Sequence, residues 1–263
     1  MRRFTLFLAA SSLASLAAAQ APTPPVAPPP PQPGAAEPMT QAKPANMSPA
    51  PQPDATKKDA KWDVNARHAP GHDAQIDTRT GTWMSVDVSP DGKEIAFDLL
   101  GDVYTIPISG GEARPLATGN AWEMQPRYSP DGREIAFTSD RSGKPQIYIM
   151  NAADGSNVRR LTVNESYADR ATWSPAPFNE IAYTAQTGEW YDIKIHELAT
   201  GTVRQITFGE GSNEGPAYSS NGKHLAFTST RAGGTQVFTI GRDGRGLKQI
   251  TRSGNNQTPA WSQ

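Results

Sequence analysis

Short runs in which apolar and polar residues alternate recur along the C-terminal part of the chain and predict β-strands. Each run follows a turn signal, of which Ser89-Pro90-Asp91-Gly92 is the first. Proline sets the backbone angle of the second turn position, aspartate bonds back to nearby backbone, and glycine accepts a positive φ. The tetrapeptide therefore predicts a hairpin turn. The strand after the turn recurs at Glu94–Phe97, Glu134–Thr138, Glu180–Thr184 and His224–Thr228.

Three further runs complete each repeat, and the last of them, the fourth run of the repeat, ends in an aromatic residue just before the next marker serine. The first copy has Val88 at this position. The marker serines are about 40–45 residues apart, a period that is typical of a β-propeller when it comes with short strands and turn signals. Four strands joined by hairpins make one propeller blade, and such scaffolds mostly serve recognition. The aromatic residues, which we expect in the core between blades, are Tyr128, Trp173, Tyr218 and Trp261.

The fourth run of each repeat is predicted to be the innermost strand of its blade. It contains Pro126, Pro216 and Pro259 in three copies. Proline cannot donate to a strand ladder and belongs on a sheet edge, which the innermost strand turns toward the central channel. The two middle runs occur four times, whereas the outer and inner runs occur five times, because residues 75–88 supply a leading pair. This count predicts about four blades, in a ring that is either closed or incomplete.

The N-terminal part of the chain has a different composition. Two arginines, an apolar stretch and Ala17-Ala18-Ala19 predict a signal peptide over residues 1–19, cleaved near Ala19. Residues 20–73 are rich in proline and predict a disordered, extended linker. Residues 74–263 then form one all-β propeller domain, long enough for a sizeable core. We therefore expect a periplasmic protein, exported and released from its signal peptide.

Composition excludes several other functions. The net charge of −1 gives no electrostatic footprint for nucleic acid. The part after the signal peptide has no apolar stretch of membrane-spanning length, so no membrane insertion is expected. The chain has no cysteine, which excludes disulfides, thiol nucleophiles and zinc sites built on cysteine.

The sequence predicts a protein without catalytic residues, metal or cofactor. It lacks a Gly-x-Ser-x-Gly elbow and a His-Glu-x-x-His motif, and His68 and His72 flank Pro70 and Gly71, which break a helix. We therefore do not expect an enzyme.

Two arginines near the predicted inner strands are the first candidates for binding. Arg127 and Arg170 could line the channel or its mouth, where cations would suit a peptide that carries a carboxylate. Solvated or salt-bridged arginines are the alternative. A second candidate pair, Asp140 and Arg141, follows a predicted strand, where a hydrogen-bonded corner or an ion pair between blades competes with ligand contact.

At this level of detail the repeats resemble those of TolB-type propellers. The segment Ser129–Tyr148 carries the resemblance most closely, and Pro259-Ala260-Trp261-Ser262 is similar to the end of TolB. The resemblance covers residues 74–263. It implies a periplasmic component of the Tol–Pal envelope system that binds the peptidoglycan-associated lipoprotein. TolB is six-bladed and carries an α/β domain ahead of its propeller, where this sequence has the Pro-rich linker and four repeats.

A second group shares the repeat. Trp62–Asn65, Ile76–Trp83 and Asp98–Asp102 resemble the propeller that opens some exported amidohydrolases, and exported prolyl-peptidases carry similar propellers. The sequence thus predicts an envelope module that recognises a protein or peptide, for which a Pal-like lipoprotein is one candidate partner. Two alternatives stay open: a truncated accessory propeller of an exported amidohydrolase or prolyl-peptidase, and a module that binds peptidoglycan or another sugar.

Overall fold

The computed structural model describes residues 63–66, 76–209 and 211–262 of the chain. The expected signal peptide and almost all of the expected linker lie outside these residues. The described residues belong to one compact unit, Lys58–Gln263. No helix occurs among them.

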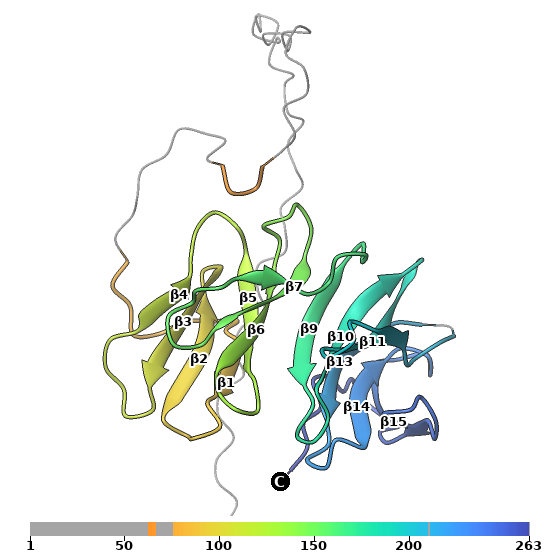
Figure 1. Cartoon of the computed structure of the whole chain (residues 1–263). Coiled ribbons are helices and arrows are strands. Elements are labelled where there is room, and N and C mark those ends of the chain that lie inside the picture. Colours follow the sequence, from red (N-terminus) through yellow and green to blue (C-terminus); the bar gives the residue numbers. More distant parts are fainter. Residues whose placement is uncertain (1–62, 67–75, 210, 263) are drawn as a thin grey trace, which may run out of the picture. The chain divides into compact units, whose positions relative to one another are not determined.

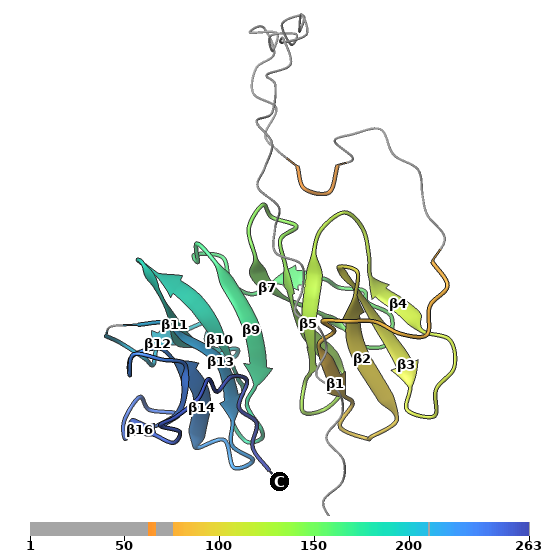
Figure 2. The same ribbon diagram turned by 180° about the vertical axis from the view of Figure 1, so that it is seen from behind.

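The described residues form four four-stranded antiparallel sheets, each built from strands in chain order (Figures 1 and 2). This confirms the predicted four-stranded blades, which we number one to four along the chain. The first blade holds β1 (Val86–Val88), β2 (Glu94–Leu99), β3 (Asp102–Pro107) and β4 (Arg114–Ala117), and the second holds β5 (Glu123–Tyr128), β6 (Glu134–Ser139), β7 (Gln146–Asn151) and β8 (Arg159–Arg160). The third holds β9 (Ala168–Trp173), β10 (Glu180–Thr187), β11 (Trp190–Glu197) and β12 (Val203–Gln205), and the fourth holds β13 (Asn213–Tyr218), β14 (His224–Ser229), β15 (Gln236–Gly241) and β16 (Lys248–Gln249).

The marker tetrapeptide forms the first hairpin of a blade, as predicted. In the first blade the Gly92 amide donates to the Ser89 carbonyl at 2.8 Å, which closes the turn, and the φ of Gly92 is 71°. The Ser89 hydroxyl donates to Asp91 at 2.7 Å and accepts the Glu94 amide at 2.9 Å. The side chains thereby satisfy polar groups that the turn would leave unpaired. Ser129 and Ser219 make the same pair of bonds in the second and fourth blades.

The strands β1, β5, β9 and β13 are the innermost strands. Each lies at one edge of its sheet and contacts the corresponding strand of a neighbouring blade. Pro126 and Pro216 therefore lie on edge strands, as the missing amide of proline requires.

Three inner strands carry the same β-bulge. The register slips after Met124, Asp169 and Glu214, where the next residue is in the left-handed region with φ between 53° and 63°. The amide freed at the bulge donates to the blade before it: Gln125 to the Asp98 carboxylate at 2.6 Å, and Gly215 to the Thr184 hydroxyl at 3.1 Å.

The hydrophobic core lies between the blades, in three clusters. Each cluster joins small and β-branched residues of one blade to aromatic and large aliphatic residues of the next. Between the third and fourth blades, for example, Ala182 and Ile193 pack with Phe227 and Phe238. Tyr128 and Tyr218 are buried members of these clusters and Trp173 packs against one, as expected for this repeat position.

Both ends of the repeat array differ from the prediction. The leading run at Ile76 and Asp77 is not a strand, and β1 has only three residues. The trailing run around Pro259 has inner-strand geometry without a paired strand: Thr258 has a φ of 48°, like the three bulge residues, and the Trp261 indole donates to the Ala217 carbonyl at 3.0 Å. A closing blade needs two middle strands beside this run, and the described residues supply none. Of the two predicted arrangements, the described part of the chain adopts the incomplete ring.

Candidate functional site

A pocket of about 430 Å³ lies where the inner strands end, at the face of the propeller that carries the marker turns. We call it the channel-mouth pocket. Every blade contributes to it, because the ends of β1, β5, β9 and β13 converge there. Its lining residues are Asp87, Val88, Pro90, Arg127, Tyr128, Ser129, Pro130, Thr172, Trp173, Pro175, Tyr218, Ser219 and Ser220.

The polar centre of this pocket comes from one repeat position, the residue after the proline position of the inner strand. This position holds Asp87, Arg127 and Thr172 in the first three blades. The Arg127 guanidinium donates through Nη1 to the Pro126 and Val86 carbonyls, at 2.7 and 3.2 Å. These bonds hold one terminal nitrogen of the guanidinium. Its other two nitrogens have no partner among the described residues. Arg127 is thus the cation that a ligand in the pocket would meet.

The Asp87 carboxylate lies beside this cation. It accepts the Tyr128 amide at 2.8 Å, which ties β1 to β5. Burial raises the pKa of Asp87 above its usual value, although the Tyr128 amide and the Arg127 charge oppose the rise. The negative charge of Asp87 reduces the positive field of Arg127.

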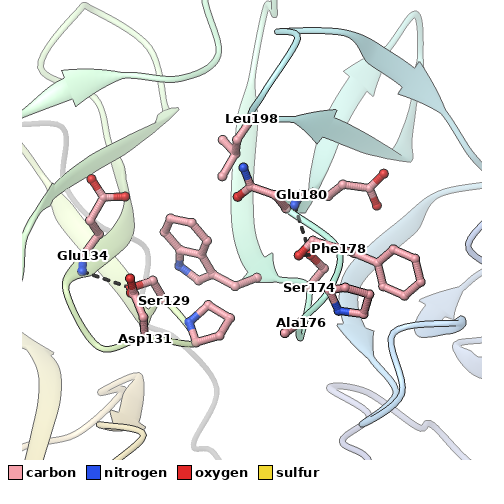
Figure 3. Close-up of a pocket in the computed structure, with 12 residues that line it drawn as sticks. Ser129, Asp131, Glu134, Ser174, Ala176, Phe178, Glu180 and Leu198 are labelled. Carbon is pink, nitrogen blue, oxygen red and sulfur yellow. Dashed lines mark hydrogen bonds between the residues drawn. The ribbon is translucent and has the colours of Figure 1, made fainter.

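A second pocket, of about 240 Å³, lies between the second and third blades (Figure 3). We call it the inter-blade pocket. Its apolar lining includes Trp173, Phe178 and Leu198. It shares Ser129, Pro130 and Trp173 with the channel-mouth pocket, so the two pockets adjoin. Figure 3 shows the two marker serines on opposite sides, each accepting the backbone amide of a glutamate: Glu134 to Ser129 and Glu180 to Ser174, both at 3.0 Å.

Glu180, at the rim of the inter-blade pocket, has a structural role. Two arginines hold its buried carboxylate: Arg242 with two hydrogen bonds of 2.6 Å and Arg204 with one of 3.1 Å. The Tyr218 hydroxyl donates to the same carboxylate, and the Arg242 guanidinium lies 4.1 Å from the Phe178 ring centre. Burial alone would raise the pKa of Glu180, but the hydrogen bonds from both arginines outweigh it and the pKa is lowered. This cluster joins the third blade to the fourth.

The structure separates the two arginines that the sequence suggested as a binding pair. Arg127 lines the channel-mouth pocket, whereas Arg170 lines neither of the two pockets. Arg170 is the bulge residue of β9, and its guanidinium lies 3.6 Å from both the Asp169 and Glu214 carboxylates. The salt-bridged alternative thus describes the geometry of Arg170.

The second candidate pair, Asp140 and Arg141, lies at a corner inside the second blade. The Arg141 guanidinium pairs with Glu123 at 2.8 Å and lies over the rings of Phe137 and Tyr148. The Asp140 carboxylate accepts the Trp122 amide at 2.8 Å. Because Glu123 begins β5 and the channel-mouth pocket lies at its other end, this corner is remote from the pocket along the strand. Arg231 forms a similar corner in the fourth blade, with Asn213 in place of the glutamate.

Sequence reasoning did not select Asp87, Thr172 or Trp173 as site residues. The signal was present for the first two, since they share the repeat position of Arg127. The sequence does not show that the strand ends converge, because that depends on how the blades pack.

Among the described residues, no cluster of three or more His, Asp or Glu could hold a metal ion. Nor does any described segment form a helix with the length and apolarity needed to span a membrane.

Comparison with known proteins agrees with the repeat architecture. An uncharacterized protein of Agrobacterium fabrum is 31% identical over 170 residues, which are 63% of this chain and 57% of that protein. A TolB homolog of Chlorobium luteolum is 31% identical over 53% of this chain and 31% of its own length. An uncharacterized peptidase of Bacillus subtilis, YuxL, is 27% identical over 66% of this chain and 27% of its own length. The chain thus spans 57% of the length of the first relative and less than a third of the length of the other two.

Solved structures give the same result. A putative TolB from Agrobacterium tumefaciens superposes with a TM-score of 0.60 and 29% identity, over 64% of this chain and 61% of that one. TolB from Acinetobacter baumannii gives a TM-score of 0.59 and 28% identity, over 68% of this chain and 46% of that one. The model of the family described as TolB beta propeller domain matches residues 68–263, which are the blades and the residues just before them. With its four-stranded blades and repeated marker turns, the chain belongs to the TolB beta propeller domain family.

Proposed function

We propose that this chain is an exported recognition module of the bacterial envelope, which binds a protein partner through an extended peptide that ends in a carboxylate. The observation that carries the proposal is the channel-mouth pocket, where every blade contributes a strand end and Arg127 is the cation available to a ligand. The predicted signal peptide and the TolB relatives support the envelope location. A Pal-like lipoprotein is one candidate partner.

The two adjoining pockets suit an extended peptide. A terminal carboxylate would bind the free nitrogens of Arg127 through charge-assisted hydrogen bonds. An apolar side chain further along the peptide would enter the inter-blade pocket, against Trp173 and Phe178. The chain between them would cross the shared lining at Pro130, a rigid surface without a backbone donor. This division of roles, one polar anchor and one apolar anchor, is common in small binding sites.

The experiment compares peptides with free and amidated C-termini. An array of such peptide pairs, of varied sequence, is measured against the purified chain by fluorescence anisotropy. We expect the free acids to bind more tightly, and Arg127→Ala to weaken them about tenfold or more, since a charge-assisted bond contributes roughly 1.5–3 kcal/mol. Arg133→Ala is the matched control, because Arg133 is a solvent-exposed arginine that lines neither pocket.

Two further measurements complete the test. Binding of the free acids should weaken with added salt, because ions screen the attraction. Arg170→Ala should leave the affinity unchanged, since Arg170 lies at the bulge and not in the pocket. Equal affinity for free and amidated peptides, or equal losses in the Arg127 and Arg133 variants, would refute the assignment of the site.

A second candidate function is an accessory propeller of a hydrolase. The similarity to the peptidase YuxL favours it, although this chain spans only 27% of that protein. Our proposal remains a non-enzymatic module. Peptide and amide substrates incubated with the purified chain should then turn over at background rates. Turnover that copurifies with the chain would overturn the non-enzymatic proposal.

A further inference from the structure

The three junctions between consecutive blades, which we number one to three, use a common set of side chains. In each of the first three blades the second strand begins with a glutamate, and an arginine of the outermost strand of the same blade contacts it. The nitrogen–oxygen distances are 3.8 Å for Glu94 with Arg114, 2.8 Å for Glu134 with Arg159 and 3.1 Å for Glu180 with Arg204. The third member of the set is the aromatic residue just before the marker serine of the following blade.

At the first and third junctions this aromatic residue is a tyrosine whose hydroxyl donates to the glutamate. The oxygen–oxygen distance is 3.3 Å from Tyr128 to Glu94 and 3.3 Å from Tyr218 to Glu180. Both tyrosines are buried in the cores between blades, so the ring packs while the hydroxyl satisfies a carboxylate oxygen. Each of these two glutamates thus has an arginine and a phenol hydroxyl as partners.

The second junction lacks the phenol. Trp173 takes the place of the tyrosine, and its indole donates to the Arg127 carbonyl at 3.0 Å instead. The Oε1 atom of Glu134 pairs with Arg159, whereas its Oε2 atom has no hydrogen-bond partner within the described part of the chain. An ionised carboxylate oxygen is a strong acceptor, so the second junction offers an unused acceptor.

This unused acceptor belongs to the inter-blade pocket, which lies at the second junction. Glu134 lines the pocket together with Trp173 and Leu198, and Figure 3 shows Glu134 and Leu198 on its two sides. Leu198 has the repeat position of Arg242, because the amide of each donates to the carbonyl of the residue before the second strand of its own blade. Where Arg242 pairs with Glu180, Leu198 therefore provides an apolar wall.

We propose that the inter-blade pocket selects a tyrosine side chain of the bound peptide, whose ring packs against Trp173 and Leu198 and whose hydroxyl donates to Glu134. The inference rests on the proposed function for the peptide itself, and it specifies the side chain that enters this pocket. The ligand then supplies the phenol that Tyr128 and Tyr218 supply at the other junctions. The pocket volume of about 240 Å³ has room for one aromatic side chain.

A neutral donor suits this carboxylate better than a cation does. Arg159 already balances the charge of Glu134, and Glu94 has the same complement of one arginine and one phenol. A basic side chain would also bring its charged head against the apolar wall at Leu198, where desolvation is costly. The pocket should therefore prefer tyrosine to lysine as well as to phenylalanine.

Peptides that differ in one side chain test this preference. The probes are alanine-based peptides with a free C-terminus and one tyrosine, phenylalanine or lysine at the second to sixth position from that end, measured by fluorescence anisotropy. At the best position we expect tyrosine to bind about tenfold more tightly than phenylalanine, because its hydroxyl bonds to a charged acceptor. Glu134→Ala should weaken binding of the tyrosine peptide and leave that of the phenylalanine peptide nearly unchanged.

Glu94→Ala is the matched control. Glu94 has the same repeat position, but Tyr128 already bonds to it and it lines neither pocket, so the ratio of tyrosine to phenylalanine affinity should not change. Glu134→Gln serves as a second variant if Glu134→Ala unfolds. It should also lower the ratio, because a neutral amide oxygen accepts a weaker hydrogen bond than a carboxylate.

Amidated copies of the peptides separate this inference from the proposed function. A tyrosine preference that Glu134→Ala removes supports the inference, even if the amidated peptides bind as tightly as the free acids. If free acids bind through Arg127 with equal affinity for tyrosine and phenylalanine at every position, the inference is overturned and the proposed function stands. A tyrosine preference that survives Glu134→Ala, or tighter binding of the lysine peptides, also overturns the inference. Failure of every peptide to bind would overturn both.

Discussion

Glu180 shows how a single side chain joins two blades. Its buried carboxylate receives hydrogen bonds from Arg242, Arg204 and Tyr218, so three segments of the chain meet at one charge. A weaker copy of this arrangement joins the first blade to the second, where Arg114 and Tyr128 contact Glu94. A buried charge that loses its partners is costly, so we expect the Glu180 cluster to contribute more than the surface ion pairs.

The lowered pKa of Glu180 predicts a pH dependence of stability. Its folded-state pKa lies below the usual 4.5, so its stabilising effect is fully present above pH 4.5 and is lost as pH falls through the lowered value. In urea unfolding monitored by tryptophan fluorescence, Glu180→Gln should reduce the free energy of unfolding by about 1–3 kcal/mol at pH 7. The difference from the wild type should shrink on acidification through this range.

Glu134→Gln is the control for this prediction. Glu134 pairs with Arg159 at 2.8 Å, but both side chains are more exposed than Glu180. We expect a loss of at most about 1 kcal/mol. A Glu180→Gln difference that does not change with pH would contradict the role assigned to the carboxylate charge.

The bulged inner strand is the element that links neighbouring blades. At the bulge the backbone turns an amide away from its own sheet, and a side chain of the preceding blade accepts it. Asp98 does this for Gln125 and also accepts the Ser85 amide at 2.9 Å. In the later blades the corresponding position holds threonine, and Thr184 accepts the Gly215 amide. The bulge thus serves as a hydrogen-bonded contact between sheets.

Removing the acceptor at this position should destabilise the junction. Asp98→Ala leaves two backbone amides without a partner and should lower the free energy of unfolding by about 2–4 kcal/mol, since each unsatisfied buried group costs roughly 1–3 kcal/mol. Asp98→Thr, the residue that the other blades use, keeps one acceptor and should lose about half as much. Chemical denaturation of both variants measures this. Equal losses in the two variants would show that the charge of Asp98, and not its hydrogen bond to the Gln125 amide, stabilises the junction.

Across the four blades, stability depends on contacts between neighbours. The three cores lie between consecutive blades, and among the described residues the first and fourth blades each have one face without a neighbouring blade. In such an array the inner units are held from both sides and the outer ones from one side only. This arrangement predicts a gradient of local stability along the chain.

Native-state hydrogen exchange should reveal that gradient. We expect the slowest amides in β6, β7 and β10, which lie in the second and third blades between two cores, and the fastest in β1 and β16. Exchange that is uniformly slow in all four blades would show that the array opens only as a single unit.

The blade architecture was largely predictable, because it depends on local chemistry. The turn tetrapeptides require particular backbone angles, and the alternation of apolar residues selects strands, so the hairpins after Ser89 and Ser129 formed where expected. The inner strand was identified by Pro126 and Pro216, which need an edge. The placement of Tyr128, Trp173 and Tyr218 between blades also followed from their repeat position, whereas Trp261, predicted to be in the core, is 39% exposed.

The candidate site could be predicted only in part. Arg127 lines the channel-mouth pocket, whereas Arg170 lies at a bulge that no sequence pattern indicates, since Gln125, Arg170, Gly215 and Thr258 have little in common. The amides of Gln125, Arg170 and Gly215 donate to side chains of the preceding blade, which are contacts between residues far apart in the chain.

By itself the sequence determined the strands, their turns and their order within each blade, because these depend on neighbours within a few residues. Only the tertiary structure decided that the ring of described blades is open and that Asp87, Arg127 and Thr172 line one pocket. It also decided which residues of neighbouring blades form the three cores. The reason is physical: each of these features depends on the packing of one blade against another, which no single repeat encodes.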